Sequence, residues 1–418
     1  MTALETRLWR WMKKRILWIC FAVVLVAGAW IRYWYLPLTH SDISYYYSLW
    51  MDYFARKGLA AAFDPDTGYN YSAVFAYLFV ILAKIFGTGN IALVIKLAGL
   101  LPELATDGLC LCLIASVLPP KNRATGMLTG FVALWLNPIL IWNVAAWGQT
   151  DVFYLLPSVL SVLLLLRERP GWALICLGVA LSLKLQAVFL APLFAAAWFC
   201  GRKRFSCLWF LALPAVVLVS GLPMMLVGES PLATFTFFFG QSGQYQALTA
   251  LTMNRYNLYS LLNDMVYHID NATVDMFLRT GIVLCVAPLG GMLVWMVKRN
   301  VVLTARNTLL LAAWCVLCCC FLLPRMHERY ALVGEVLLCC WAVCLRKPRG
   351  AVYVLAALLP TVGAYANELY RVTFLGAQAG GALSLALLCA LTWEILRDMG
   401  ASVPASGRRT ACLAERGE

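Results

Sequence analysis

The 418-residue chain is 62% hydrophobic and only 13% charged, and its mean hydropathy is +0.79. Soluble globular chains carry about 25% charged residues, so the composition excludes a soluble enzyme and predicts an all-α polytopic membrane protein in one domain, residues 1–418. The net charge of +13 could indicate nucleic-acid binding, but basic cytoplasmic loops explain it more simply in a membrane protein. The 16 cysteines lie mostly in apolar stretches, where cysteine behaves as a small hydrophobe.

The N-terminal quarter divides into one span and a long loop. A basic segment precedes the first span, residues 16–31, and places the N-terminus in the cytoplasm. Residues 32–94 then form the first outer loop, in which 43–57 is predicted to be an amphipathic interfacial helix that ends at Gly58. The apolar run 71–86 would reach only about 24 Å as a helix, against a hydrocarbon core of about 30 Å. We therefore expect it to stay in the outer leaflet.

The rest of the chain contains further apolar runs of helix length. With the first span they predict about twelve transmembrane helices and place both termini inside, with about two thirds of Lys and Arg on the cytoplasmic side. Residues 95–345 would hold the core helices and an outer loop at 228–276, followed by C-terminal helices at 346–396 and a cytoplasmic tail at 397–418. The predicted spans after the first are 95–118, 124–146, 152–166, 171–184, 187–201, 205–227, 277–297, 301–323, 331–345, 350–366 and 374–396.

Polar side chains gather on the predicted outer face. They come from five places that are far apart in the sequence: His40-Ser41-Asp42; Glu103 with Asp107; Trp147-Gly148-Gln149-Thr150-Asp151; Lys184-Leu185-Gln186; and Arg325-Met326-His327-Glu328-Arg329-Tyr330.

The acidic members of this set each have two interpretations. Asp42 could cap the interfacial helix, which stabilises a helix by about 1 kcal/mol, or act as a general base. Asp151 could cap the span that follows it in the same way. Glu103 and Asp107 lie at membrane depth, where a charge costs about 2.5–3.5 kcal/mol and commonly marks a functional interior. A hydrogen bond between helices is the alternative for both.

The basic members also leave two possibilities open. Lys184 could extend to the lipid head groups, and Arg325 and Arg329 could bind such groups nonspecifically. Alternatively, the two arginines and His327, at the depth of Lys184, would form a phosphate clamp. A phosphate pocket at membrane depth, with a carboxylate and aromatic rings beside it, is what transfer of a sugar from a polyprenyl phosphate to a hydroxyl requires.

The order of these motifs resembles that of the C-type (GT-C) glycosyltransferases, most closely the bacterial membrane proteins related to GPI mannosyltransferases. The matching pieces are the acidic first loop, Leu136-Asn137-Pro138 with Trp147 to Asp151, Leu183 to Gln186 with Pro192, Met253 to Leu258, and Arg325 to Tyr330. The resemblance implies a GT-C-like bundle with Asp42 as catalytic base. Many relatives have two carboxylates at that point, whereas this chain has one, with His40 two residues before it.

The resemblance and the residues together predict an inverting glycosyltransferase. It would move a hexose, mannose by resemblance, from a polyprenyl-phosphate donor in the membrane to an extracytoplasmic glycan, glycolipid or protein. We expect a multi-pass plasma-membrane protein with an extracytoplasmic site, or an ER-membrane protein in a eukaryote. No cofactor is expected, although a divalent metal is possible.

The same analysis gives each candidate residue a role. Asp42 is the base, and Arg325, His327, Arg329 and Lys184 bind the donor phosphate. Substrate binding is assigned to His40, Glu103, Asp107, Gln149, Asp151, Gln186 and Glu328. The alternatives are a twelve-span transporter or flippase for a lipid-linked or small solute, and a non-catalytic partner in glycan assembly.

Overall fold

The computed structural model describes residues 2–232, 251–266 and 271–400. These residues form helices joined by short loops, and the described residues contain two isolated β-bridges but no strand. Several helices are long and apolar enough to cross a bilayer. The predicted all-α polytopic membrane fold is therefore confirmed.

Seven of the described helices meet the length and composition of a membrane span, or eight if one bent pair counts as a single span. The bent pair, α5 (Pro120–Trp135) with α6 (Pro138–Ile141) and η4 (Trp142–Trp147), turns by 45° at Asn137-Pro138. The predicted count of twelve is not confirmed. The seven are α1 (Ala3–Tyr35), α4 (Ile91–Val117), η6 (Cys207–Leu211) with α10 (Ala212–Ser220) and α11 (Leu222–Leu226), α13 (Asn271–Lys298), α14 (Ala305–Leu322), α16 (Pro348–Tyr370) and α17 (Ala377–Gly400).

Most of the remaining core helices are short, which lowers the count below twelve. A 14-residue helix such as α8 reaches about 21 Å, whereas the hydrocarbon core measures about 30 Å. These short helices are α7 (Asp151–Leu166), α8 (Pro170–Leu183) and η5 (Leu185–Leu190) with α9 (Ala191–Cys200). The helix formed by η9 (Glu328–Ala331) with α15 (Leu332–Leu345) is longer but includes the charged residues Glu328, Arg329 and Glu335. Helices therefore occupy the predicted ranges, but their length and composition do not identify these four as membrane spans.

Three predicted segments differ in extent from the structure. The first span was expected at 16–31, but α1 is a helix from Ala3 to Tyr35. The outer loop expected at 228–276 is interrupted by η8 (Tyr259–Val266) and by the start of α13 at Asn271, while 233–250 and 267–270 lie outside the described residues. Of the predicted tail, α17 includes the first residues and 401–418 lie outside the described part.

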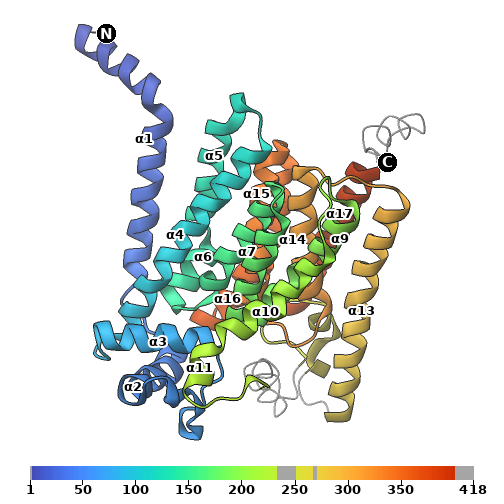
Figure 1. Ribbon diagram of the computed structural model, residues 1–418. Coiled ribbons are helices and arrows are strands. Elements are labelled where there is room, and N and C mark those ends of the chain that lie inside the picture. Colours follow the sequence, from blue (N-terminus) through green and yellow to red (C-terminus); the bar gives the residue numbers. More distant parts are fainter. Residues whose placement is uncertain (1, 233–250, 267–270, 401–418) are drawn as a thin grey trace.

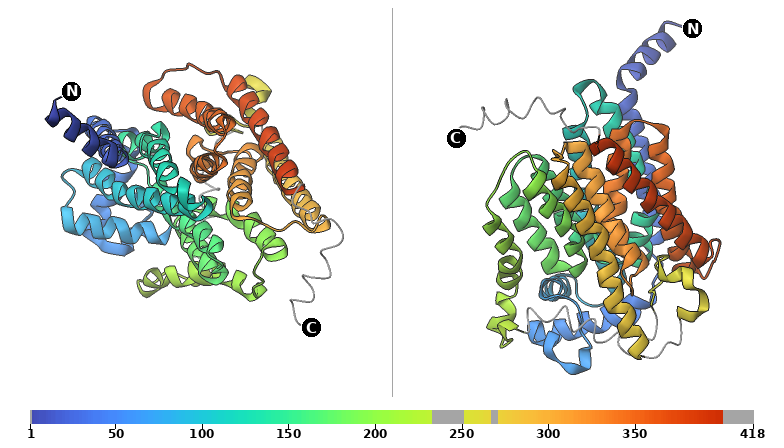
Figure 2. Two further views of the ribbon diagram at one scale, coloured as in Figure 1. Left: turned by 90° about the horizontal axis from the view of Figure 1, so that it is seen from above. Right: turned by 90° about the vertical axis from the view of Figure 1, so that its right-hand side faces the viewer.

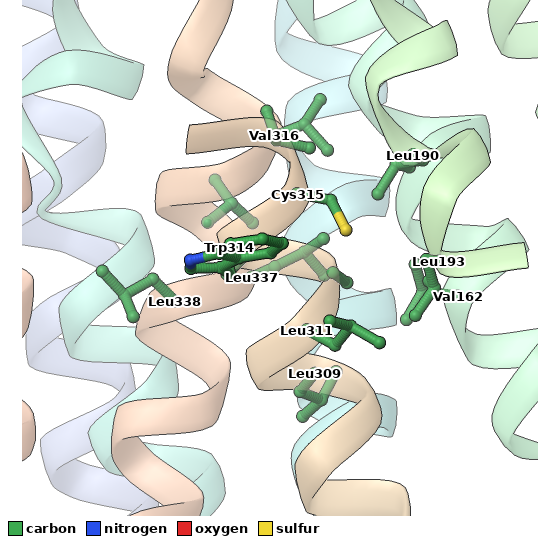
Figure 3. Packing of buried hydrophobic residues seen from close by; sticks show 14 of the residues in the cluster. Val162, Leu190, Leu193, Leu309, Leu311, Trp314, Cys315, Val316, Leu337 and Leu338 are labelled. Atoms are coloured by element: carbon green, nitrogen blue, oxygen red, sulfur yellow. The ribbon is translucent and has the colours of Figure 1, made fainter. Parts of the chain in front are cut away.

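The central helix of the bundle is α14. Residues from Asn307 to Phe321 are buried on every side of it, as expected for a helix that is apolar all round and enclosed by protein. Its side chains Leu311, Trp314 and Cys315 lie among residues of α7, α9 and α15 (Figure 3). This core gives the surrounding short helices a fixed position.

The loop between α1 and α4, which was predicted to be the first outer loop and is called the first loop below, forms a second, smaller core. The π-helical turn η1 (Ile43–Tyr47) continues into α2 (Ser48–Lys57), which ends at Gly58, so a helix occupies the predicted range 43–57, while its place in the membrane interface stays a prediction. Buried aromatic residues of α2 pack on α3 (Ala73–Phe86), as in the stacked pair Phe54 and Phe79. The 3-10 segments η2 (Gly58–Phe63) and η3 (Pro65–Thr67) join the two helices. The loop is therefore a packed unit rather than an open strand of chain.

Helix α1 lies at the edge of the bundle, and its N-terminal part projects beyond the other helices (Figures 1 and 2). Arg32 fixes its far end through a buried ion pair with Glu103 of α4 and a 2.8 Å hydrogen bond to the Trp135 carbonyl of α5. The start of α1 and the end of α17 lie at one end of the bundle, and α2 and α3 lie at the other (Figure 1).

Helix α3 lies across the bundle axis rather than along it (Figure 1), an orientation consistent with a helix that does not cross the membrane. We predict that a cysteine at the exposed position Asn90, after α3, is labelled by an impermeant thiol reagent from the same side as one at Tyr45. A cysteine at exposed Lys121 should need permeabilisation. The exposed native residues Cys112, Cys207 and Cys389 would first be replaced by serine. If instead the Lys121 position were labelled from the same side as Tyr45, and the Asn90 position only after permeabilisation, α3 would span the membrane, because α4 separates Asn90 from Lys121.

Candidate functional site

A cavity of about 540 Å³ lies between the first loop and the adjacent ends of the core helices. The first loop supplies rings and Asp42 to its wall, while segments 253–254 and 327–330 and the end of α16 supply charged and amide groups. The lining residues are Asp42, Tyr46, Tyr47, Trp50, Gly68, Asn70, Tyr71, Trp147, Lys184, Gln186, Met253, Asn254, His327, Glu328, Arg329, Tyr330 and Glu368.

Asp42 does not cap a helix with its side chain. Although it immediately precedes η1, its carboxylate makes no hydrogen bond to a backbone N–H of the first turn. Its Oδ2 atom instead accepts hydrogen bonds from Trp147 Nε1 at 3.0 Å and Gln149 Nε2 at 2.5 Å. Of the two interpretations of Asp42, the structure therefore disfavours the cap. Oδ1 accepts no hydrogen bond from the described residues and belongs to a side chain on the cavity wall.

A tight backbone turn aims Trp147 and Gln149 at the same carboxylate. Gly148 between them adopts φ +77°, a conformation that glycine tolerates far better than other residues. A Cβ atom at Gly148 would also meet Ile43 Cδ1 at 2.7 Å. The π-helical segments η1 and η4 thus approach each other closely beside Asp42, and π segments often occur at functional sites.

Lys96 of α4 fixes the chain that leads to His40 and Asp42. Its buried ammonium group donates hydrogen bonds to the carbonyls of Tyr35, Leu36 and Leu38 at 3.0, 3.3 and 2.5 Å. These carbonyls follow the last turn of α1, where a cation is favourable because helix carbonyls there lack intrahelical partners. Lys96 therefore anchors the segment that presents Asp42.

The cationic side of the cavity consists of Lys184 and Arg329. Lys184 forms an ion pair with Asp151, and Arg329 Nη1 lies 2.9 Å from Glu328 Oε1, with its Nε 3.7 Å from Asp151 Oδ2. Asn143 donates a further 3.0 Å hydrogen bond to Asp151. The carboxylate side chains are 0% exposed, whereas Lys184 and Arg329 keep 12% and 11% exposure. The cations therefore retain access to the cavity, and Asp151 supports them.

His327 lies beside Arg329 and is held by its backbone. It forms β-bridges with Met253 and Asn254, and Arg329 Nη1 lies 3.4 Å from its Nδ1. Burial, reinforced by the positive charges of Arg329 and Lys184, lowers the pKa of His327 well below its usual value. The imidazole is therefore neutral at pH 7, and it can accept or donate a hydrogen bond to a ligand without adding charge.

The segment opposite His327 is anchored in the core by Arg255. Its guanidinium group donates to Glu335 Oε1 of α15 at 3.3 Å and also bonds Thr361 of α16. The backbone N–H groups of Met253 and Arg255 both donate to the Met326 carbonyl, at 3.1 and 3.3 Å. The sequence motif around Asn254 therefore packs directly against the motif around His327.

His40 connects Asp42 to the far wall of the cavity. Its ring centroid lies 4.7 Å from that of Trp147, and its Nε2 lies 3.9 Å from Glu368 Oε1. Burial lowers the pKa of His40, although the charges of Asp42 and Glu368 oppose the shift. His40 does not line the cavity itself, so its contacts support the residues that do.

The structure brings most of the sequence-predicted residues together. Gln186 lines the cavity, and Gln149 is buried behind Asp42, which makes it a positioning residue rather than a direct contact. Arg325, Glu103 and Asp107 are not in the lining. Glu103 pairs with Arg32, and neither carboxylate oxygen of buried Asp107 has a hydrogen-bond partner among the described residues. We therefore leave these three out of the proposed substrate site.

Sequence reasoning assigned no role to Glu368, Asn254 or Tyr46, all of which line the cavity. Asn254 belongs to a motif that the resemblance did include. Glu368 gave a weaker signal, an acidic residue at the outer end of a C-terminal helix. In the described part of the chain, no group of three His, Cys, Asp or Glu side chains is arranged to hold a metal ion. The expected absence of a metal stays a prediction.

Comparison with known proteins gives a family match over the middle of the chain. The model of Glycosyltransferase family 87 matches residues 69–324, more than half of the sequence. No curated protein matches the chain. The matched region contains Gln149, Asp151 and Lys184 but neither Asp42 nor Arg329, so the match does not bear on the roles of those two. By the extent of the match, this chain belongs to glycosyltransferase family 87.

Proposed function

We propose that the protein is an inverting glycosyltransferase that moves a hexose, mannose by resemblance, from a polyprenyl-phosphate donor to a hydroxyl of an extracytoplasmic glycan, glycolipid or protein. The observation that carries this proposal is that Asp42 and the cations Lys184 and Arg329 line one cavity. Membership of a glycosyltransferase family supports sugar transfer over solute transport. A base and a phosphate site in one cavity favour a catalyst over a non-catalytic partner.

Asp42 is the proposed general base. Trp147 and Gln149 both donate to Oδ2, which orients the carboxylate and leaves Oδ1 for the acceptor hydroxyl. Oδ1 takes the hydroxyl proton while the hydroxyl oxygen forms a bond to the sugar C1 atom. The bond from C1 to the phosphate oxygen breaks, and the polyprenyl phosphate leaves with the electron pair. One displacement on the face opposite the leaving group inverts the configuration at C1.

Lys184 and Arg329 are the proposed binding groups for the leaving phosphate. A sugar phosphodiester carries one negative charge, and charge-assisted hydrogen bonds from a guanidinium or ammonium group are among the strongest in proteins. The four groups Lys184, Arg329, Asp151 and Glu328 sum to zero charge, so the empty site places no net charge in a low-dielectric region. His327, neutral at pH 7, would add a hydrogen bond.

The Asp42→Asn variant separates catalysis from folding. Asparagine keeps an oxygen that can accept from Trp147 and Gln149, so the melting temperature should barely change. Loss of the ionisable carboxylate should lower turnover about 10²–10⁴-fold, the usual contribution of a general base. Initial rates of polyprenyl-phosphate release from a labelled polyprenyl-phosphate mannose measure this.

The matched control is Asp52→Asn, on the exposed face of α2, where Asp52 pairs only with Arg56. It should keep full turnover. Near-normal turnover in Asp42→Asn would refute the base assignment. If neither wild type nor variants turned over any lipid-linked sugar, a non-catalytic role would replace the enzyme.

A second prediction concerns the donor phosphate. Arg329→Lys keeps the charge but loses the planar fork, so the donor KM should rise about 10- to 150-fold, the equivalent of the roughly 1.5–3 kcal/mol of a hydrogen bond to a charged group. Kinetics at saturating acceptor, with varied donor, give this constant. Melting curves of the variant must accompany these kinetics to check that it folds. Removing one partner of a buried ion pair costs about 3–5 kcal/mol of stability.

Arg325→Lys provides the comparison for Arg329→Lys. Arg325 was a candidate for the same phosphate from its sequence position, but it lies outside the cavity lining. Its substitution should change the donor KM far less. Equal effects of the two substitutions, or no effect of Arg329→Lys, would contradict the phosphate assignment.

A further inference from the structure

Glu368 is a further carboxylate on the cavity wall, besides Asp42 and the Glu328 that pairs with Arg329. It lies in the last turn of α16, and 20% of its side chain is exposed. Its Oε2 atom accepts a 2.7 Å hydrogen bond from Asn254 Nδ2 and lies 3.7 Å from Arg371 Nη1, while Oε1 lies 3.9 Å from His40 Nε2. His40 thus has Glu368 on one side and the Asp42 segment on the other. The phosphate cations Lys184 and Arg329 make no ion pair with Glu368 among the described residues.

Asn254 is held beside Glu368 by a strained backbone. It adopts φ +63°, which costs a non-glycine residue energy and is commonest for asparagine and aspartate. Its β-bridge with His327 fixes that conformation. The side-chain amide donates to Glu368, and its carbonyl oxygen accepts no hydrogen bond from the described residues. The Asn254–Glu368 pair therefore offers acceptor oxygens to the cavity.

An exposed aromatic ring completes this part of the cavity lining. Tyr46 lines the cavity and is 51% exposed, whereas Tyr47 and Trp50 beside it are buried in the first-loop core. Its neighbour Tyr45 is 74% exposed but does not line the cavity. The Tyr46 ring centroid lies 5.9 Å from that of Trp50, and the exposed part of the Tyr46 ring can stack on the apolar face of a ligand.

We infer that Glu368, Asn254 and Tyr46 form the acceptor subsite and that it takes a neutral carbohydrate. A carboxylate and an amide bind sugar hydroxyls through several hydrogen bonds, and a ring stacks on the sugar face. Two carboxylates, Asp42 and Glu368, disfavour an anionic group at this side of the cavity, which leaves the phosphate to the cationic side. The inference rests on the proposed function and narrows its acceptor to a glycan or glycolipid sugar.

The test measures donor and acceptor constants separately. The donor is a short polyprenyl-phosphate mannose, and the acceptor probes are octyl α-mannoside and a serine- and threonine-containing peptide. We expect transfer to the mannoside and not to the peptide. Glu368→Gln should raise the mannoside KM about 10- to 150-fold by weakening a charge-assisted hydrogen bond. The donor KM and donor hydrolysis by water should stay within about threefold of wild type, a change worth less than about 1 kcal/mol.

Tyr46→Ala and Tyr45→Ala form a matched pair. Tyr46→Ala should raise the mannoside KM and Tyr45→Ala should leave it unchanged, because both remove an exposed ring but only one lines the cavity. Asn254→Ala is a second probe of the Glu368 oxygens, with melting temperatures as the check on folding.

Three results would overturn the subsite: an unchanged mannoside KM in Glu368→Gln, an equal rise in the donor KM, or transfer by wild type to the peptide alone. In each of these the proposed function stands, since the donor is still consumed. A wild-type protein that neither hydrolyses the donor nor transfers its sugar would overturn both.

Discussion

The pairing of charges away from water is the constraint on which this structure depends. Lys184, Asp151 and the adjacent pair Glu328 and Arg329 come from three separate places in the sequence and meet as alternating charges. An unpaired charge in such surroundings costs several kcal/mol, so each of these residues requires its partners. The chain of ion pairs therefore joins α7, the α8–η5 turn and η9, and the same contacts direct two cations toward the cavity.

Charge pairing of the same kind holds the elements around the cavity. Arg32 with Glu103 attaches α1 to α4, and Arg255 with Glu335 attaches the 253–255 segment to α15. Neither pair lines the cavity. Each pair fixes the end of a loop, and the residues next to that end line the cavity or lead to it. The rigidity of the site therefore comes from charges buried near the cavity. Membrane-depth charge alone is consequently a poor guide to direct substrate contact.

Backbone geometry provides the rest of the organisation at Asp42. Lys96 holds three carbonyls after α1, and Gly148 turns the chain so that Trp147 and Gln149 reach one carboxylate oxygen. Because both donors bind Oδ2 of Asp42, its Oδ1 atom can accept a proton, as a general base must. This arrangement requires the close approach of Gly148 to Ile43, where a side chain at position 148 would strain the left-handed backbone and displace the Ile43 Cδ1 atom.

Composition and periodicity by themselves determined the membrane class, the amphipathic helix after Asp42 and the set of polar motifs from which most cavity residues come, because these depend on local hydrophobicity and spacing. The tertiary structure decided which motifs meet. It set Arg325, Glu103 and Asp107 apart from the cavity, placed Gln149 behind Asp42, and brought Glu368 and Asn254 to the wall. Sequence spacing could not give these results, since contacts between residues about 100 or more positions apart depend on how the helices pack.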